Sequence, residues 1–370
     1  MDSLFSDSSN GRSRVARIKN VDVSDFPWQR GAEIGNALAT ELSEPRFVRY
    51  SRLALEDALA DADVSRCPLP RARTGVALGT TLGLVDELTR GAGPLSLNET
   101  RRRLAFDTLI DDVSRGAVLE GPKTVFSLAC ASGLCAAEQA ALELELGRAD
   151  AMVVGGADTL GRFMQGGFCS LHAFAPSAGD SEHGREGLVL GEGAAFVVLE
   201  PREAARARDR AYGAALKAQR LTSDGYHLAS PDPSGSGMAQ AITLALDDAE
   251  LEPSDIGAIV MTALGSMLHE RMLKDALSSS LGSRASEIPV TSHEAAIGHV
   301  LAASGVLVLA YAARLLSEGN VRPAFSLDSL GTAALVSASP CSMPLRERNI
   351  LTLSVGFGGF NGVAIVGSAE

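Results

Sequence analysis

The sequence predicts an α/β protein in which buried strands alternate with helices through two successive halves. Short apolar segments that end in glycine, such as Gly75-Val-Ala-Leu-Gly79, are typical of strands buried in a parallel sheet. Alanine-rich segments with apolar residues at helical spacing lie between them. This alternation of strands and helices favours an α/β fold.

The elements of the first half follow one another closely. A helix is predicted over residues 47–62, where apolar residues recur at helical spacing. A strand that begins at Thr124 ends in a sharp turn within ACASG, and residues 135–148 then form a helix. Buried strands are predicted for residues 150–158 and 194–200.

The second half repeats this cycle. A helix over residues 237–248 precedes a strand over residues 256–261, and residues 300–316 form a long apolar helix. Residues 351–355 and 362–366 predict a closing hairpin. The repetition suggests an internal duplication, with the active site where the two halves meet.

We expect one compact unit of two halves, residues 14–202 and residues 203–370. Residues 1–13 are rich in serine, aspartate, asparagine and glycine and are predicted to be disordered. This polar amino terminus predicts no signal peptide, and no run of eighteen apolar residues that would predict a membrane span occurs. We therefore expect a cytoplasmic protein that does not contact membranes.

The composition is that of an acidic globular protein. The chain has 46% hydrophobic residues, and 45 acidic against 33 basic residues give a net charge of −12. Because phosphate binding requires clustered cations, nucleic acid is not an expected partner. The five cysteines are odd in number and lack ligand-like spacing, so neither a disulfide framework nor a metal site is expected. The glycines of VVGGAD and VLGEGA fit tight packing and not a phosphate-binding loop, and no cofactor is expected.

Cys130 is the candidate nucleophile. It lies in ACASG at a strand-to-helix turn, where the unpaired N–H groups and the dipole of a helix favour a thiolate. Small neighbours such as Ala131 and Gly133 would let a substrate approach the sulfur. A buried structural cysteine fits the same pattern, so the spacing leaves both roles open. Cys135, five residues later, is expected to face the core.

Six segments occur in the order found in one enzyme family: TVFSLACASG, DAMVVGGAD, REGLVLGEGAAFVVLE, TSDGYHLASPDPSG, GHVLAASG and SVGFGGFNG. From about Arg14 onward the chain resembles the β-ketoacyl synthases, which extend acyl chains on acyl carrier protein. The resemblance implies the five-layered αβαβα thiolase fold, built from two duplicated halves, and a homodimer or a heterodimer with a second ketosynthase. It also implies acyl carrier protein as a partner. An acidic chain would need a local basic patch for it, and Arg101, Arg102 and Arg103 are one candidate if they are not simply a solvated helix end.

The resemblance assigns roles residue by residue. Cys130 takes the place of the family nucleophile, and His299 in GHVLAASG takes that of the second histidine. Phe357 resembles the residue that gates the acyl pocket, and the backbone N–H groups of Cys130 and Phe357 would bind the thioester oxygen. His227, in TSDGYHLASPDPSG, is a candidate for shaping the substrate entrance, with a surface position as the alternative.

Several positions depart from the family pattern. An ungapped alignment puts Thr262 at the position of the first histidine, and His269, seven residues later, is a candidate to replace it. Glu294 stands at the position of the family lysine, and Val308 at that of the supporting glutamate. The strand with which family members open is also missing, and residues 15–18 are the stretch that could take its place.

These departures affect two reactions differently. Acyl transfer needs a thiolate and an oxyanion hole, and both can be retained here. Decarboxylation of a malonyl unit also needs two donors at the enolate oxygen, so loss of one imidazole is expected to slow it about a hundredfold or more. Glu294 places a negative charge near that anion, which opposes decarboxylation. Beside His299 the same carboxylate could act as a base, which predicts an acyltransferase or hydrolase with a Cys/His/Glu set.

Three functions are open at this point. The first is an acyl-thioester transferase that acts on acyl carrier protein substrates through Cys130 and His299, in fatty-acid-like or polyketide biosynthesis, with or without elongation. The second is a non-elongating partner subunit similar to chain-length factors. The lost histidine, lysine and glutamate favour it, whereas the retained Cys130 opposes it. The third is an acyl-binding scaffold that keeps only the fold.

Overall fold

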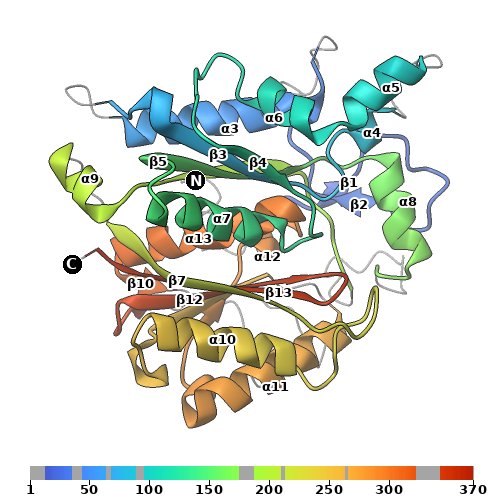
Figure 1. The fold of residues 1–370 in the computed structure, drawn as a ribbon. Coiled ribbons are helices and arrows are strands. Elements are labelled where there is room, and N and C mark those ends of the chain that lie inside the picture. The colour runs from blue at the N-terminus through green and yellow to red at the C-terminus, as the bar shows by residue number, and fades with distance from the viewer. Residues whose placement is uncertain are drawn as a thin grey trace.

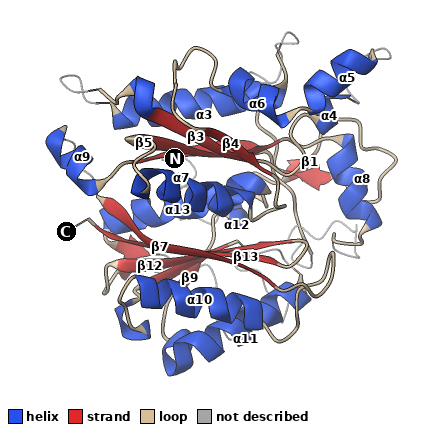
Figure 2. Cartoon of the chain, in the orientation of Figure 1, coloured by secondary structure: helices blue, strands red, loops and turns tan. Residues whose placement is uncertain are grey.

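In the computed structural model the chain forms five stacked layers in the order helix, sheet, helix, sheet, helix (Figure 1). The structure describes residues 13–35, 44–63, 68–88, 96–174, 187–209, 213–262, 266–321 and 342–369. Figure 2 shows helices between the two sheets and on the outer face of each. The α/β prediction from the alternation of strands and helices is confirmed.

The sheet of the first half has four strands in the order β4-β3-β5-β6. Their bounds are β4 (Lys123–Phe126), β3 (Thr74–Gly79), β5 (Ala151–Asp158) and β6 (Gly193–Leu199). β3 pairs in parallel with β4 and β5, and β6 lies antiparallel to β5. β3 and β5 are buried along their whole length, as expected for strands with helices on both faces.

The sheet of the second half has five strands in the order β7-β13-β12-β8-β9. Their bounds are β7 (Ala214–Ser223), β13 (Phe360–Ser368), β12 (Asn349–Gly356), β8 (Ala258–Met261) and β9 (Val290–Thr291). β8 pairs in parallel with β9 and β12, and β13 lies antiparallel between β12 and β7. The expected closing hairpin is the β12–β13 pair, which extends further at both ends than predicted.

Helices fill the remaining three layers (Figure 1). One outer layer holds α3 (Arg46–Ala62) and α6 (Phe106–Val113), and the other holds α10 (Ser236–Asp248) and α11 (Met267–Leu281). α7 (Ser132–Glu145), α12 (Glu294–Ile297) and α13 (Ala302–Glu318) lie between the sheets. The connections contain α4 (Val85–Leu88), α5 (Leu97–Leu104), α8 (Arg162–Ser170), α9 (Arg202–Ala207) and the 3₁₀ turns η1 (Arg71–Arg73), η2 (Pro253–Asp255) and η3 (Gly282–Ser286). β10 (Asn320–Val321) pairs with β11 (Met343–Pro344).

The two sheets match strand for strand except at one edge. By order and direction β4, β3, β5 and β6 correspond to β9, β8, β12 and β13. The second sheet continues with β7, whereas no strand of the described residues pairs with the far edge of β6. Ala16–Arg17 forms β1, which pairs with β2 (Arg30–Gly31) outside both sheets, so this stretch does not replace the opening strand.

A groove of about 1610 Å³ follows this open edge of β6. Residues of α3, α7 and α13 form its walls, together with β7. Cys135 lies on one wall, and burial, followed by the charge of Glu138, raises the pKa of its thiol to about 11. Cys135 is therefore a protonated thiol at neutral pH, in keeping with a packing role.

Small residues bring the central helices close to each other and to the first sheet. A Cβ atom on Gly133 of α7 would lie 2.5 Å from the Ala302 carbonyl oxygen of α13. A Cβ atom on Gly156 of β5 would lie 2.6 Å from the same oxygen. Because interiors are packed without spare volume, no side chain fits at either glycine. These glycines of ACASG and VVGGAD therefore set the spacing of the layers.

Some predictions fall outside the described residues, namely the disorder of residues 1–12 and any role of Cys67, Cys341 or His183. Within the described ranges, no helix combines the length and apolar character needed to cross a membrane. The same ranges contain no group of three or more His, Cys, Asp or Glu side chains that could hold a metal ion.

Candidate active site

Cys130 lies where the chain turns from β4 into α7. The turn is sharp because Ala129 has a positive φ of 49°. Ser132, the first residue of α7, fixes it: its hydroxyl accepts a hydrogen bond from the Leu128 N–H at 2.8 Å and donates to the Ala129 carbonyl at 2.5 Å. The Ser354 hydroxyl of β12 donates to the Cys130 carbonyl at 3.1 Å. Contacts from both halves thus hold the thiol at the amino-terminal end of a helix.

His299 follows α12 in the second half of the chain. Its backbone is held by the segment before β6, because its N–H donates to the Val189 carbonyl at 2.7 Å and its carbonyl accepts from the Gly191 N–H at 2.8 Å. The Nδ1 atom of its ring lies 2.5 Å from Oε1 of Glu294. The two side chains are only 1% and 4% exposed. The sequence-predicted pair of His299 and Glu294 is therefore in direct contact.

The charge of Glu294 controls the protonation of His299. Burial alone would lower the pKa of the imidazole, but the Glu294 carboxylate, and after it the Cys130 sulfur, raise this pKa well above its ordinary value. The favoured form is an imidazolium that donates Nδ1–H to Glu294. Nε2 has no hydrogen bond of ordinary geometry among the described residues, although Cys130 lies near the ring. Its proton is available to a substrate or leaving group beside the sulfur.

Phe357 lies in the turn between β12 and β13 and packs against the buried cluster of the site. Its ring centroid lies 5.5 Å from that of Phe168 and 5.7 Å from that of His269. Cys130 belongs to the same buried cluster and is 1% exposed. Phe357 packs against this cluster, so the gating role of Phe357 stays a prediction.

The N–H groups of Cys130 and Phe357 lie in two turns that touch each other. A Cβ atom on Gly356 would lie 3.1 Å from the Ala131 nitrogen, so the two backbones are in close contact. Neither N–H donates to a backbone carbonyl of the described residues. Two such donors can bind an oxygen that becomes negative during acyl transfer.

Thr262 directly follows β8 at the position expected for the first histidine. It is fully buried, and its N–H donates to the Leu353 carbonyl at 3.0 Å. Its hydroxyl oxygen accepts a hydrogen bond from the Val355 N–H at 3.3 Å. Thr262 therefore continues the pairing with β12 just before the Phe357 turn, and it supplies no imidazole.

His227 is exposed and lies outside the buried cluster. Its Nδ1 accepts hydrogen bonds from the N–H groups of Ala229 and Ser230, both at 3.1 Å, so the ring stabilises its own loop. The loop touches the gate turn, because the Gly358 N–H donates to the Leu228 carbonyl at 2.8 Å. The structure thus places His227 near the turn but does not direct its Nδ1 toward the thiol.

Two other histidines are buried near His299. Burial first, and then the charge of His299, lower the pKa of His269 to about 4. Burial also lowers the pKa of His293 to about 4, with opposing contributions from Glu294 and His299. Both are neutral at pH 7. His172, in contrast, is exposed.

Asp158 supports the site and was missed by the sequence analysis. This last residue of β5 is buried, and its carboxylate accepts hydrogen bonds at 3.0 Å from the Thr80 hydroxyl, the Thr81 N–H and the Ala302 N–H. Burial raises its pKa to about 6 in spite of these bonds. Asp158 joins the loop after β3 to the start of α13. An acidic residue at the end of the buried VVGGAD strand was the available signal.

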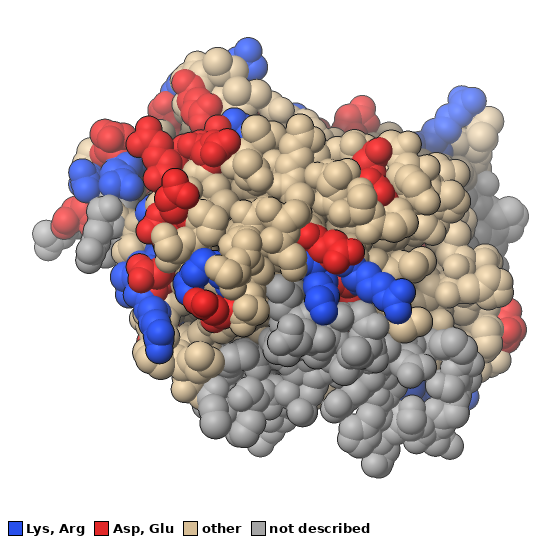
Figure 3. Space-filling view, turned by 90° about the horizontal axis from the view of Figure 1, so that it is seen from below, with Lys and Arg blue, Asp and Glu red and all other residues tan. Residues whose placement is uncertain are grey.

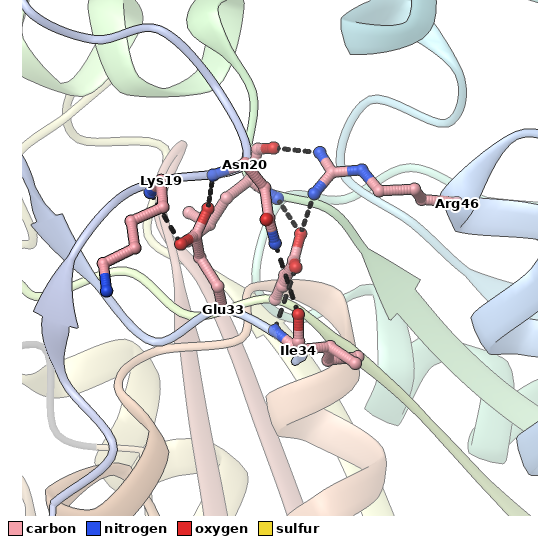
Figure 4. Close-up of polar contacts among 7 residues, drawn as sticks. Lys19, Asn20, Glu33, Ile34 and Arg46 are labelled. Atoms are coloured by element: carbon pink, nitrogen blue, oxygen red, sulfur yellow. Dashed lines mark hydrogen bonds and ion pairs between the residues drawn. The ribbon is translucent and has the colours of Figure 1, made fainter. Parts of the chain in front are cut away.

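A second buried acid fixes the segment that holds His299. Glu192 pairs with Arg46 at 2.9 Å and accepts from the Ile34 N–H at 3.0 Å. Figure 4 shows Arg46 and Ile34, which both bind this carboxylate, and Glu33 beside them binding the backbone of Asn20. The buried pair therefore ties the amino-terminal segment and α3 to the loop before β6.

The comparisons with known proteins agree on the fold and the family. The family models described as "Beta-ketoacyl synthase, N-terminal domain" and "Beta-ketoacyl synthase, C-terminal domain" match residues 41–205 and 213–328. An actinorhodin polyketide putative beta-ketoacyl synthase 1 of Streptomyces coelicolor is 30% identical, over 98% of this chain and 84% of that protein. A 3-oxoacyl-[acyl-carrier-protein] synthase 2 of Coxiella burnetii is 27% identical, over 96% of this chain and 92% of that protein.

Two solved structures show the same architecture. A type II polyketide ketosynthase structure, in complex with its acyl-carrier protein, matches with a TM-score of 0.86 and 23% identity, over 100% of this chain and 95% of that one. The ishigamide ketosynthase/chain length factor matches with a TM-score of 0.81 and 22% identity, over 99% and 94% of the two chains. The five layers and the cysteine at the start of a central helix define a thiolase fold. Within that class, the chain belongs to the β-ketoacyl synthase family.

Proposed function

We propose that this chain transfers acyl groups from an acyl carrier protein to Cys130. The observation that carries the proposal is the buried 2.5 Å contact between His299 and Glu294, next to the buried thiol of Cys130. In the described residues Cys130 is the cysteine at which a helix start, an imidazolium and two N–H donors meet. This is the set of groups that attack on a thioester requires.

The transfer proceeds by exchange of one thioester for another. The Cys130 thiolate attacks the acyl carbon, and the carbonyl oxygen becomes an anion held by the N–H groups of Cys130 and Phe357. The bond from the acyl carbon to the carrier thiol then breaks, and His299 gives its Nε2 proton to the departing sulfur. Glu294 keeps the imidazole oriented and charged. The products are acyl-Cys130 and free carrier thiol.

The acyl group then passes to an acceptor, and the names of the relatives indicate the kind of biosynthesis in which this occurs. They are named for actinorhodin polyketide and for 3-oxoacyl-[acyl-carrier-protein] synthesis, so polyketide or fatty-acid-like biosynthesis is the proposed setting. A condensing role requires carbon dioxide release from a malonyl unit. If the acceptor is instead water or an alcohol, His299 acts as its base, because the imidazole is neutral after it has protonated the carrier thiol.

Carrier protein requires a basic surface on this acidic chain. Figure 3 shows acidic and basic side chains mingled on the face seen from below, with no continuous basic patch in the part that it draws in colour. Arg101 and Arg102 are exposed on α5, at the opposite end of the molecule in Figure 1. We place carrier docking at α5. Replacing both arginines with glutamate should raise the KM for loaded carrier about tenfold and leave kcat within twofold.

Mass spectrometry tests the transfer itself. The chain is incubated with octanoyl-loaded acyl carrier protein, beside Cys130→Ala and the matched Cys135→Ala variant. An octanoyl adduct is expected on the wild type and on Cys135→Ala, and none on Cys130→Ala. Failure of the wild type to form an adduct on Cys130 would overturn the proposal.

A non-elongating partner subunit is the second candidate, because Thr262 supplies no imidazole and the Cys130 thiol is buried. It predicts a chain that takes up no acyl group and becomes stable on assembly with a second ketosynthase. Sedimentation velocity of the purified chain separates the candidates. A homodimer that forms the octanoyl adduct excludes the partner-only role.

A further inference from the structure

His269 is a buried histidine with an unsatisfied nitrogen beside the gate. It lies in the first turn of α11 and is 4% exposed. Its ring meets that of Phe357 almost perpendicularly, at 85° and a centroid distance of 5.7 Å. Its Nδ1 atom is buried and has no hydrogen-bond partner among the described residues.

Such a nitrogen can form a hydrogen bond with a group that enters the site. Buried polar atoms are nearly always hydrogen-bonded, so an exception calls for a specific reason. Burial and the charge of His299 keep the ring neutral at pH 7, so one of its nitrogens carries a proton that it can donate. Phe357 packs against the His269 ring, so movement of the Phe357 ring would change the surroundings of this imidazole.

The position of His269 complements what Thr262 has lost. Thr262 lies at the end of β8, and α11 begins five residues later, so both belong to the same strand-to-helix connection. The Thr262 hydroxyl oxygen is engaged by the Val355 N–H and keeps the strand pairing intact. The helix that follows thus carries an imidazole that borders Phe357.

We propose that His269 is the second imidazole donor of this site and binds the thioester carbonyl oxygen of a malonyl unit beside Cys130. The inference rests on the proposed acyl transfer and extends it to elongation. When the malonyl C–C bond breaks, carbon dioxide leaves and the electron pair moves toward the carbonyl oxygen. His269, and His299 once its Nε2 has regained a proton from solvent, stabilise this enolate through hydrogen bonds. The enolate carbon then attacks acyl-Cys130, the new C–C bond forms, and the cysteine leaves as thiolate.

Two variants separate hydrogen bonding from packing. His269→Phe fills the same space without a donor, and His269→Asn retains an amide that can donate from about the position of Nδ1. Carbon dioxide release from malonyl-loaded carrier, with octanoyl-Cys130 already formed, is expected to fall about a hundredfold in His269→Phe and less than tenfold in His269→Asn. Formation of the octanoyl adduct should stay within threefold of wild type in both. His172→Asn, on an exposed histidine, is the control and should change neither rate.

Each result has one meaning. Equal carbon dioxide release in His269→Phe and wild type overturns the role of His269, as does equal loss in both variants with unchanged adduct formation. A wild type that forms the adduct but releases no carbon dioxide overturns the inference and leaves the transfer proposal standing. Absence of any adduct in the wild type overturns both. Thermal unfolding of each variant shows whether a loss of rate comes with a loss of folding, in which case His269→Asn alone is compared with wild type.

Discussion

Glu294 controls the charge of His299, and removal of its charge should be visible directly in catalysis. Glu294→Gln keeps the size of the side chain and a hydrogen-bonding group 2.5 Å from Nδ1, but it removes the carboxylate. Burial of the imidazole is unchanged, and burial lowers its pKa. His299 should therefore be largely neutral at pH 7.5 in the variant, whereas it is an imidazolium in the wild type.

Loss of this proton slows departure of the carrier thiol. A positioned general acid contributes on the order of 10²–10⁴-fold, so we expect acylation of Cys130 at pH 7.5 to fall about a hundredfold, or ~2.7 kcal/mol in the barrier. The pH dependence gives the sharper test. In the wild type, the rate of Cys130 acylation should decline only when the pH rises through the raised pKa of His299. In Glu294→Gln, this decline of the acylation rate should occur at lower pH.

Timed mass spectrometry of the octanoyl adduct between pH 5.5 and 9 measures both quantities. Glu143→Gln is the matched control, because Glu143 is also buried but lies on α7 and bonds to Gln139 and Arg148. An unshifted pH profile for Glu294→Gln would refute the proposed control of His299. A pH profile that shifts while the maximal acylation rate stays unchanged would show that Glu294 only sets the charge of His299 and does not orient its ring.

Three further perturbations follow from the same geometry. Phe357→Ala removes the ring over the thiol, and alkylation of Cys130 by iodoacetamide should become at least about tenfold faster; an unchanged rate would show that another group limits access. Ala129→Gly relieves a positive φ and should raise the free energy of unfolding by ~1 kcal/mol in urea titrations, so destabilisation would contradict the strained turn. Burial raises the pKa of Asp158 to about 6, so the stability that its protonated form contributes is complete below about pH 4 and lost as the pH rises through 6. Urea titrations should show that the free energy of unfolding falls by up to about 3 kcal/mol over this range in the wild type, and that this fall is absent in Asp158→Asn. The same pH dependence of the free energy of unfolding in both proteins would exclude this group.

Periodicity alone predicted most of the helices and strands, because hydrophobic spacing reports local structure. The helix expected over residues 47–62 is α3, and the strand expected over residues 150–158 is β5, each within a residue of its predicted ends. The strand expected up to the turn in ACASG ends earlier, at Phe126. Ala129, three residues beyond this end, has a positive φ, and alanine gives no sign of such a backbone in a sequence.

Some contacts of the candidate site could be predicted from the sequence, and others could not. Contact between Glu294 and His299 could be anticipated, since five residues separate them and one short helix fixes their geometry. The closeness of His269 to Phe357 could not, because 88 positions separate them and only the packing of α11 against the second sheet joins them. His227 matches a family segment in sequence, yet its Nδ1 is engaged by its own loop. Motifs locate a loop but do not reveal where its side chains point.

The unpaired edge of β6 is a surface through which one copy of the chain can associate with another. Seven residues, GAAFVVL, present a row of main-chain amides about 23 Å long at ~3.3 Å per residue, and a groove runs beside them. Such a row is a template on which foreign strands can add, and lysine is the usual protection that natural sheets place there. Concentrated preparations should therefore self-associate through this flank, and a lysine introduced at Val197 should keep them dispersed.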